Sequence, residues 1–159
     1  MKHSVLLDTS FFIRLLNDED PLHENAKGYF KYFLENEISL KTSTISIAEY
    51  CVGGELLDLP LEKIQIIPFN LDHAQKTGDF AAVIFEANKI ALKKLSPRAI
   101  IPNDSKLFAQ AHLDRSITHF VTSDARSQQT IRALKTEKPT FKILDIRTPY
   151  HEYFGLLDL

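Results

Sequence analysis

The segment SVLLDTSFF, residues 4–12, decides the fold of this chain, because a short apolar run ends at a lone acid and an aromatic pair follows. Residues 4–7 carry no charge, which is typical of a strand buried on both faces of a parallel sheet. Phe11-Phe12 and Leu15-Leu16 then have the spacing of an apolar helix face. The segment therefore predicts a buried strand that ends at Asp8 and leads into a helix.

The same alternation of strand and helix continues along the chain. The further strands that we predict are residues 38–42, 64–69, 118–122 and 141–144, and the further helices are residues 22–36, 47–53 with an extension toward 57, 71–95, 104–113 and 124–134. Pro68 would place the strand before it at an edge, and Gly78 would kink or break its helix. The pattern predicts one α/β domain over residues 1–159, a three-layer α/β/α sandwich around a small, mostly parallel sheet of about four or five strands.

The composition is that of an ordinary folded protein. Of the 159 residues, 44% are hydrophobic and 25% charged, and the net charge is −2, so nucleic-acid contacts would depend on local basic patches or metal ions. The one cysteine, Cys51, excludes an internal disulfide; we interpret it as a buried, unreactive thiol. No apolar run reaches the length of a membrane span. We therefore expect a cytoplasmic protein that neither crosses a membrane nor is exported.

Four isolated acids lie where a strand or turn gives way to a helix: Asp8, Glu49, Asp104 and Asp124. Chain segments that leave the carboxyl ends of parallel strands converge on one crevice, so we expect these acids to meet there. Four carboxylates without a cation would repel one another and raise at least one pKa. Mg²⁺ or Mn²⁺ would relieve that repulsion, and both ions commonly bind carboxylates together with phosphate oxygens. The pattern predicts a metal site that acts on a phosphate ester.

A plain structural reading of each acid stays open at this point. Ser46-Ile47-Ala48-Glu49 has the spacing of a helix capping box, and Asp104 and Asp124 could each cap the helix that they begin. The hydroxyl and amide neighbours of these acids favour a metal site over simple helix caps, because such groups can position carboxylates and water. They are Thr9-Ser10, Asn103 with Ser105, and Thr122-Ser123.

Four segments, in this order, resemble the PIN-domain family and, within it, the VapC-like toxin ribonucleases. They are LLDTSF at residues 6–11, SIAE at 46–49, NDSKLFAQA at 103–111 and VTSD at 121–124, and the likeness extends from near residue 4 to near residue 145. The resemblance implies a PIN-like sandwich and metal-dependent hydrolysis of RNA phosphodiesters with Mg²⁺ or Mn²⁺. It also implies a homodimer, inhibited by a small antitoxin whose tail covers the acidic crevice.

The resemblance assigns a role to each acid. Asp8 and Asp104 would be direct metal ligands, Glu49 would bind the metal directly or through water, and Asp124 would orient a water or a second ion. The chain departs from the compact toxin pattern between residues 86 and 102, a longer segment that carries a basic run of Lys89, Lys93, Lys94 and Arg98. We interpret that run as a solvated helix face and Arg14 and Arg126 as candidate phosphate contacts.

Other functions fit less well. A phosphotransferase of the haloacid-dehalogenase type would need a second Asp at position 10, which is Ser10 here. A nucleotide-binding loop rich in glycine is absent from a chain with five glycines in all. Two alternatives within the same fold stay open: a housekeeping RNA-processing nuclease with the same acids, and a non-catalytic RNA-binding or protein-docking module that keeps the acids as helix caps.

Overall fold

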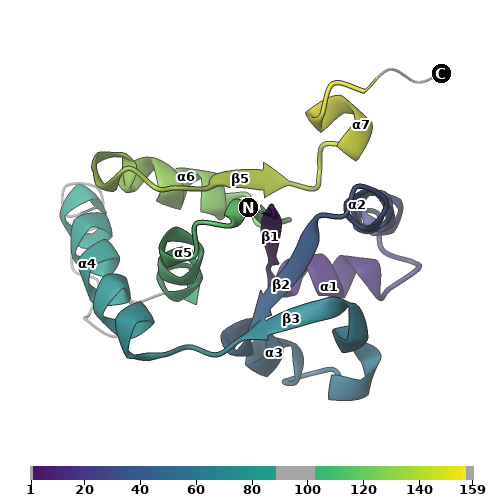
Figure 1. The fold of residues 1–159 in the computed structure, drawn as a ribbon, viewed down its shortest axis with the longest axis horizontal. Coiled ribbons are helices and arrows are strands. Elements are labelled where there is room, and N and C mark those ends of the chain that lie inside the picture. Colours follow the sequence, from purple (N-terminus) through teal and green to yellow (C-terminus); the bar gives the residue numbers. More distant parts are fainter. Residues whose placement is uncertain (1, 89–102, 157–159) are drawn as a thin grey trace.

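A five-stranded sheet, with the strand order β3-β2-β1-β4-β5, forms the centre of the computed structural model, which describes residues 2–88 and 103–156 (Figure 1). The strands are β1 (Ser4–Leu7), β2 (Ser39–Ser43), β3 (Ile64–Ile67), β4 (Ile117–Thr122) and β5 (Lys142–Asp145). All four neighbouring pairs are parallel. The predicted α/β fold is therefore confirmed, with a sheet that is wholly parallel in the described residues.

Helices cover both faces of the sheet (Figure 1). They are α1 (Thr9–Leu15), α2 (His23–Glu35), α3 (Thr44–Tyr50), α4 (Leu71–Asn88), α5 (Asn103–Leu113), α6 (Arg126–Ala133) and α7 (Tyr150–Tyr153), with 3-10 turns η1 (Leu56–Asp58), η2 (Leu61–Lys63) and η4 (Lys135–Glu137). Helices α1, α2 and α7 lie on one side of the sheet and α4, α5 and α6 on the other. None of the helices in the described part of the chain is long and apolar enough to span a membrane.

Strand β1 lies at the middle of the sheet because its side chains can be buried on both faces. Val5 and Leu7 pack in a core with α1 and α2, while Leu6 packs in a second core with α4 and α5. All three are at most 1% exposed. This alternation across a central strand explains why residues 4–7 read as a continuous apolar run.

Helix α3 differs from its prediction at both ends. It begins at Thr44 directly after β2, and the Ser43 side chain accepts a hydrogen bond from the Ile45 N–H. Ser46 thus lies inside the helix, and the capping-box interpretation of residues 46–49 is wrong. The helix also stops at Tyr50 instead of continuing toward residue 57. Cys51, the residue after it, is exposed, so the prediction of a buried thiol is wrong too.

Helix α4 passes through Gly78 without a break. The end of the predicted helix, residues 89–95, and the basic run from Lys89 to Arg98 lie outside the described residues. Six phenylalanines of the described chain are at most 1% exposed and pack in the core: Phe11, Phe12, Phe33, Phe80, Phe108 and Phe120.

Candidate acidic active site

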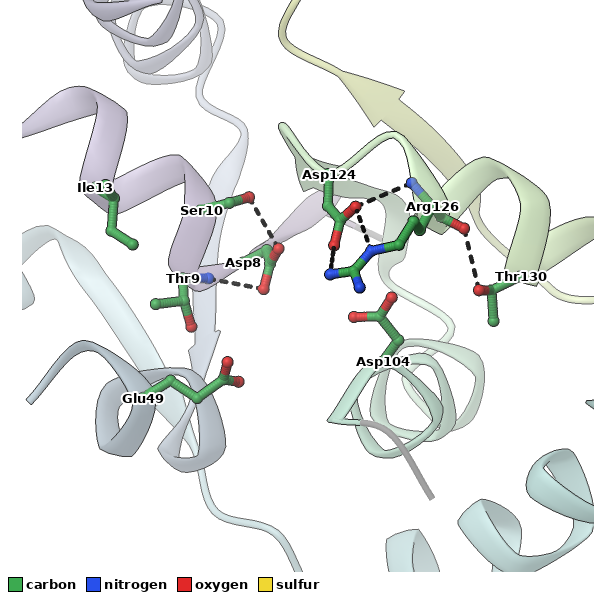
Figure 2. Close-up of a pocket in the computed structure, with 9 residues that line it drawn as sticks. All are labelled: Asp8, Thr9, Ser10, Ile13, Glu49, Asp104, Asp124, Arg126 and Thr130. Atoms are coloured by element: carbon green, nitrogen blue, oxygen red, sulfur yellow. Dashed lines mark hydrogen bonds and ion pairs between the residues drawn. The ribbon is translucent and has the colours of Figure 1, made fainter. Parts of the chain in front are cut away.

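The structure brings the four predicted acids together at the carboxyl edge of the sheet. Asp8 follows β1, Asp124 follows β4, Glu49 lies on α3, and Asp104 lies in the first turn of α5. All four line one cavity of about 370 Å³ (Figure 2). Their carboxylates point toward its shared space in Figure 2. Segments almost 120 residues apart in the sequence thus form one acidic site, as expected for an open parallel sheet.

Asp8 is the most firmly held of the four carboxylates. Its Oδ1 accepts a hydrogen bond from the Thr9 N–H at 2.8 Å, so Asp8 caps α1. Its Oδ2 accepts hydrogen bonds from the hydroxyls of Ser10 and Thr122, both at 2.9 Å. Burial raises the pKa of Asp8, although these three hydrogen bonds oppose the rise. The hydroxyl neighbours noticed in the sequence therefore do orient a carboxylate, and Asp8 combines a capping role with a place in the cavity.

Asp104 has the most clearly perturbed acidity. Burial raises its pKa to about 6, and the charges of Asp8 and Asp124 add to the rise. The Ser127 hydroxyl donates to Asp104 Oδ2 at 3.5 Å, which is at the long limit of a hydrogen bond. Helix α5 begins one residue earlier, so Asp104 lies within its first turn. A buried carboxylate beside other carboxylates binds either a proton or a cation more tightly than an isolated one.

Asp124 is paired with an arginine. Arg126 donates from Nε to Oδ1 at 3.2 Å and from Nη2 to Oδ2 at 2.9 Å, and its backbone N–H donates to Oδ1 at 2.9 Å. These hydrogen bonds lower the pKa of Asp124. The guanidinium charge also opposes the rise in the pKa of Asp104, which agrees with its place near both carboxylates in Figure 2. Asp124 thus holds a positive charge in the lining of an otherwise acidic cavity.

Glu49 is held in place through the contact between α1 and α3. The Thr9 hydroxyl donates to the backbone carbonyl of Ser46 at 3.1 Å, one turn before Glu49. Thr9 and Asp8 are consecutive, so the same junction positions both acids. The Glu49 side chain extends from the last turn of α3 toward the cavity (Figure 2).

The donor set fits a divalent cation, although the side chains are not gathered into a tight cage. Among the described residues, no three His, Cys, Asp or Glu side chains form a cluster that could hold a metal ion as they stand. Mg²⁺ needs no such cluster, since it keeps several waters and commonly takes only one or two carboxylates. Burial and the charges of neighbouring carboxylates raise the pKa values of Asp8 and Asp104, and a nearby cation would lower both pKa values. We therefore regard the residues present as compatible with Mg²⁺ or Mn²⁺.

The sequence did not point to every residue at this edge. Ile13 and Thr130 also line the cavity. Asp145 is a further acid at a strand end, held by Arg147, whose Nε donates to Oδ1 at 3.0 Å. Asp145 comes directly after the apolar pair Ile143-Leu144, as Asp8 comes after Leu6-Leu7, so the same sequence pattern could have identified it. Arg14, one of the two suggested phosphate contacts, instead pairs with Asp20 at 2.7 Å and does not line the cavity.

Comparison with known proteins agrees with this geometry. Residues 5–133 match the model of the family described as "PIN domain". That span contains all four acids and ends with α6. No curated protein sequence matches the chain.

Several solved structures share the fold. DNA-bound VapBC from Salmonella typhimurium aligns with a TM-score of 0.59 at 17% identity, over 91% of this chain and 98% of that one. VapBC2 from Rickettsia felis, bound to a DNA fragment from its promoter, aligns with a TM-score of 0.56 at 16% identity, over 89% of this chain and 97% of that one. VapC20 from Mycobacterium tuberculosis, a toxin that cleaves the sarcin-ricin loop, aligns with a TM-score of 0.54 at 17% identity, over 79% of this chain and 94% of that one. At these identities the likeness establishes the fold.

Proposed function

Because the chain belongs to the PIN-domain family, we propose that it is an endoribonuclease that hydrolyses RNA phosphodiester bonds with the help of Mg²⁺ or Mn²⁺. One observation carries the proposal: Asp8, Glu49, Asp104 and Asp124, from four separate segments, line a single cavity at the carboxyl edge of the sheet. Helix caps alone would not require the four carboxylates to share one cavity.

Asp8 and Asp104 are the residues that would hold the metal directly, with Glu49 bound directly or through water. A bound divalent ion supplies an acidified water and a positive charge beside the phosphate. Ser10 and Thr122 keep the Asp8 carboxylate in one orientation through their hydroxyls. A ligand that is already oriented loses little entropy when it binds.

Arg126 is the residue that we assign to the phosphate. Its side chain is 84% exposed and its guanidinium lies beside the cavity, where a phosphate oxygen can reach it. Arginine binds phosphate through a planar fork of donors, so one guanidinium can contact Asp124 and a phosphate together. Asp124 would then act mainly by positioning Arg126, in agreement with an outer role in the site.

We propose further that the ribonuclease is the toxin of a toxin–antitoxin pair. Two of the structural neighbours are VapBC complexes, and the third is described as a toxin. The partners would be an antitoxin that covers the acidic cavity and a second copy of this chain, in the cytoplasm. A housekeeping nuclease would have the same acids, so the presence of an antitoxin gene beside this one distinguishes the two.

The test begins with thermal unfolding across a Mn²⁺ and Mg²⁺ titration, because this measurement needs no knowledge of the RNA target. Wild type should show a saturable rise in Tm that Asp8→Asn loses. Cleavage of total RNA, followed by mapping of the new ends, then tests the activity, and growth arrest on expression, relieved by the antitoxin, tests the toxin role. Cleavage that is unaffected by EDTA and by Asp8→Asn would refute the mechanism.

A further inference from the structure

A second concave surface lies on the other side of helix α6 from the acidic cavity. It is a shallow groove of about 460 Å³ along the outer edge of strand β5, with α6 on one side and Tyr153 of α7 on the other. We call it the β5-edge groove. Ile131, Phe141 and Ile143 form its apolar part. In Figure 1 the elements that form it, α6, β5 and α7, follow one another along one border of the molecule.

The charge of the β5-edge groove has one sign. Arg132, Lys135 and Lys142 line it, all three are exposed, and none of its lining residues in the described chain is acidic. The acids nearest in sequence, Glu137 and Glu152, do not line the groove. In a chain with a net charge of −2, a groove with three cations fits an anionic occupant.

Helix α6 links this groove to the acidic cavity. Arg126 and Thr130 line the cavity, whereas Ile131 and Arg132 line the groove. Arg132 is six positions after Arg126 in the helix, a rise of about 9 Å along the axis. A single polymer could therefore contact the guanidiniums of both arginines while it crosses the helix.

We propose that the β5-edge groove binds the sugar-phosphate backbone of the single-stranded RNA that runs on from the bond in the acidic cavity. The three cations would contact successive phosphates, and the partly exposed side chains of Tyr153 and Ile131 offer surfaces against which bases pack. Alternation of cations with an aromatic platform is how proteins bind single strands with little sequence preference. This inference deepens the proposed function and rests on it for the identity of the polymer.

A peptide strand is the other occupant that the position suggests, because β5 is at the edge of the sheet and has a strand neighbour on one side only among the described residues. The cations favour RNA over a peptide, since pairing along a strand edge requires no particular charge.

The test compares two matched triple variants. The groove variant is Arg132→Gln, Lys135→Gln and Lys142→Gln. The control variant is Arg115→Gln, Lys27→Gln and Lys63→Gln, which removes one arginine and two lysines at exposed positions that line neither the groove nor the cavity. Circular dichroism and thermal unfolding confirm that both fold. A single reversal, Lys142→Glu, provides a second, smaller perturbation of the groove.

Binding is measured by fluorescence anisotropy of a labelled, mixed-sequence RNA 12-mer in EDTA, at salt concentrations between 50 and 200 mM. The groove variant should bind about tenfold more weakly or worse, and the magnitude of the slope of log K against log salt should fall by about 2, which is roughly 0.7 for each cation removed. The control variant should change the affinity less than about twofold. Lys142→Glu should weaken binding in the same direction as the groove variant.

Equal affinities and equal slopes in the two triple variants would overturn the inference and favour a peptide strand as the occupant. Failure of wild type to bind the 12-mer would overturn it as well. Because EDTA removes the metal, this result does not depend on cleavage. If the protein binds RNA through the groove but never cleaves RNA, the proposed nuclease activity is refuted and the groove inference stands. Cleavage with unchanged RNA affinity in the groove variant would refute the groove alone.

Discussion

The Arg126 guanidinium contacts both carboxylate oxygens of Asp124, at 3.2 and 2.9 Å, within an otherwise acidic cavity (Figure 2). The pair distinguishes Asp124 from Asp8 and Asp104. Asp8 and Asp104 have raised pKa values and lie near each other's charge, whereas Asp124 has a lowered pKa and a permanent cation beside it. A metal ion would relieve the repulsion between the Asp8 and Asp104 carboxylates. It would compete with Arg126 for the Asp124 carboxylate.

The first prediction concerns this pair. Arg126→Gln should raise KM for RNA and lower kcat/KM about 10- to 100-fold, because a charge-assisted contact to phosphate is lost. Asp124→Asn should give a similar loss, smaller than that of Asp8→Asn, and the double variant should be little worse than either single one. The metal-induced rise in Tm should persist in all three. Strictly additive losses, or loss of the metal response in Asp124→Asn, would instead make Asp124 a metal ligand.

The second prediction separates the metal site from the rest of the acidic edge. Asp8→Asn should abolish the Tm response to Mn²⁺ and lower cleavage by more than about a hundredfold. At a metal concentration about 100 times Kd, wild type should gain roughly 2.7 kcal/mol in the free energy of unfolding. Without metal, Asp8→Asn should fold and be at least as stable as wild type, because the hydroxyls of Ser10 and Thr122 can reverse and accept from the amide.

Asp145→Asn provides the matched control for Asp8→Asn. Asp145 also ends a strand of the same sheet, but it does not line the cavity. The Asp145→Asn variant should therefore keep the full rise in Tm with Mn²⁺. An equal loss in both variants would show that the response reflects the general charge of this edge and not a specific site.

The third prediction concerns pH in metal-free buffer. Burial raises the pKa of Asp104 from 3.8 to about 6, so the folded protein binds a proton more tightly than the unfolded chain. The stability from this group is present below about pH 4 and is lost as the pH rises through about 6, a change of roughly 1 to 3 kcal/mol. Urea denaturation in EDTA at several pH values should show this fall, and Asp104→Asn should lessen it. An unchanged profile in Asp104→Asn would assign the fall to other groups.

Much of the fold was predictable because strands buried on both faces leave a strong signal. Strand β1 has the predicted bounds, and Asp8 follows it as expected. Asp8, Asp104 and Asp124 were predictable because each lies where a strand or loop meets a helix, and the parallel topology then brings them together. Glu49, predicted at the start of a helix, lies instead in the last turn of α3. The likeness to the PIN domain predicts all four in one site.

Other features depend on local competition that the sequence does not resolve. Ser43 and Ser46 are both residue types that cap helices well. Ser43 is the cap of α3 because β2 ends there. The Asp124–Arg126 contact depends on side-chain rotamers across the start of α6, so an arginine two residues after an acid gave no sign of the pairing. Cys51 is exposed because the helix predicted over residues 47–53 ends at Tyr50, before it.

The last prediction concerns the Lys41–Asp114 ion pair, which joins β2 to the loop before β4. Lys41 Nζ lies 2.6 Å from Asp114 Oδ2 and 2.9 Å from the Ser116 hydroxyl, and the Lys41 side chain is only 12% exposed. Lys41→Met should lower the free energy of unfolding by about 2 kcal/mol, because the partly buried Asp114 carboxylate keeps its burial cost and loses its cation. Urea denaturation measures this loss.

Asp114→Asn added to Lys41→Met should recover part of the lost stability, since no uncompensated charge then remains. Although burial alone would raise the pKa of Asp114, the hydrogen bonds from Lys41 and Ser116 lower it overall. The stability that the pair supplies should therefore be present above pH 3.8 and be lost as the pH falls through the lower folded pKa. The Tm response to Mn²⁺ should persist in both variants, because neither residue lines the acidic cavity. A double variant less stable than Lys41→Met would show that Asp114 stabilises the loop through Ser116 and not through Lys41.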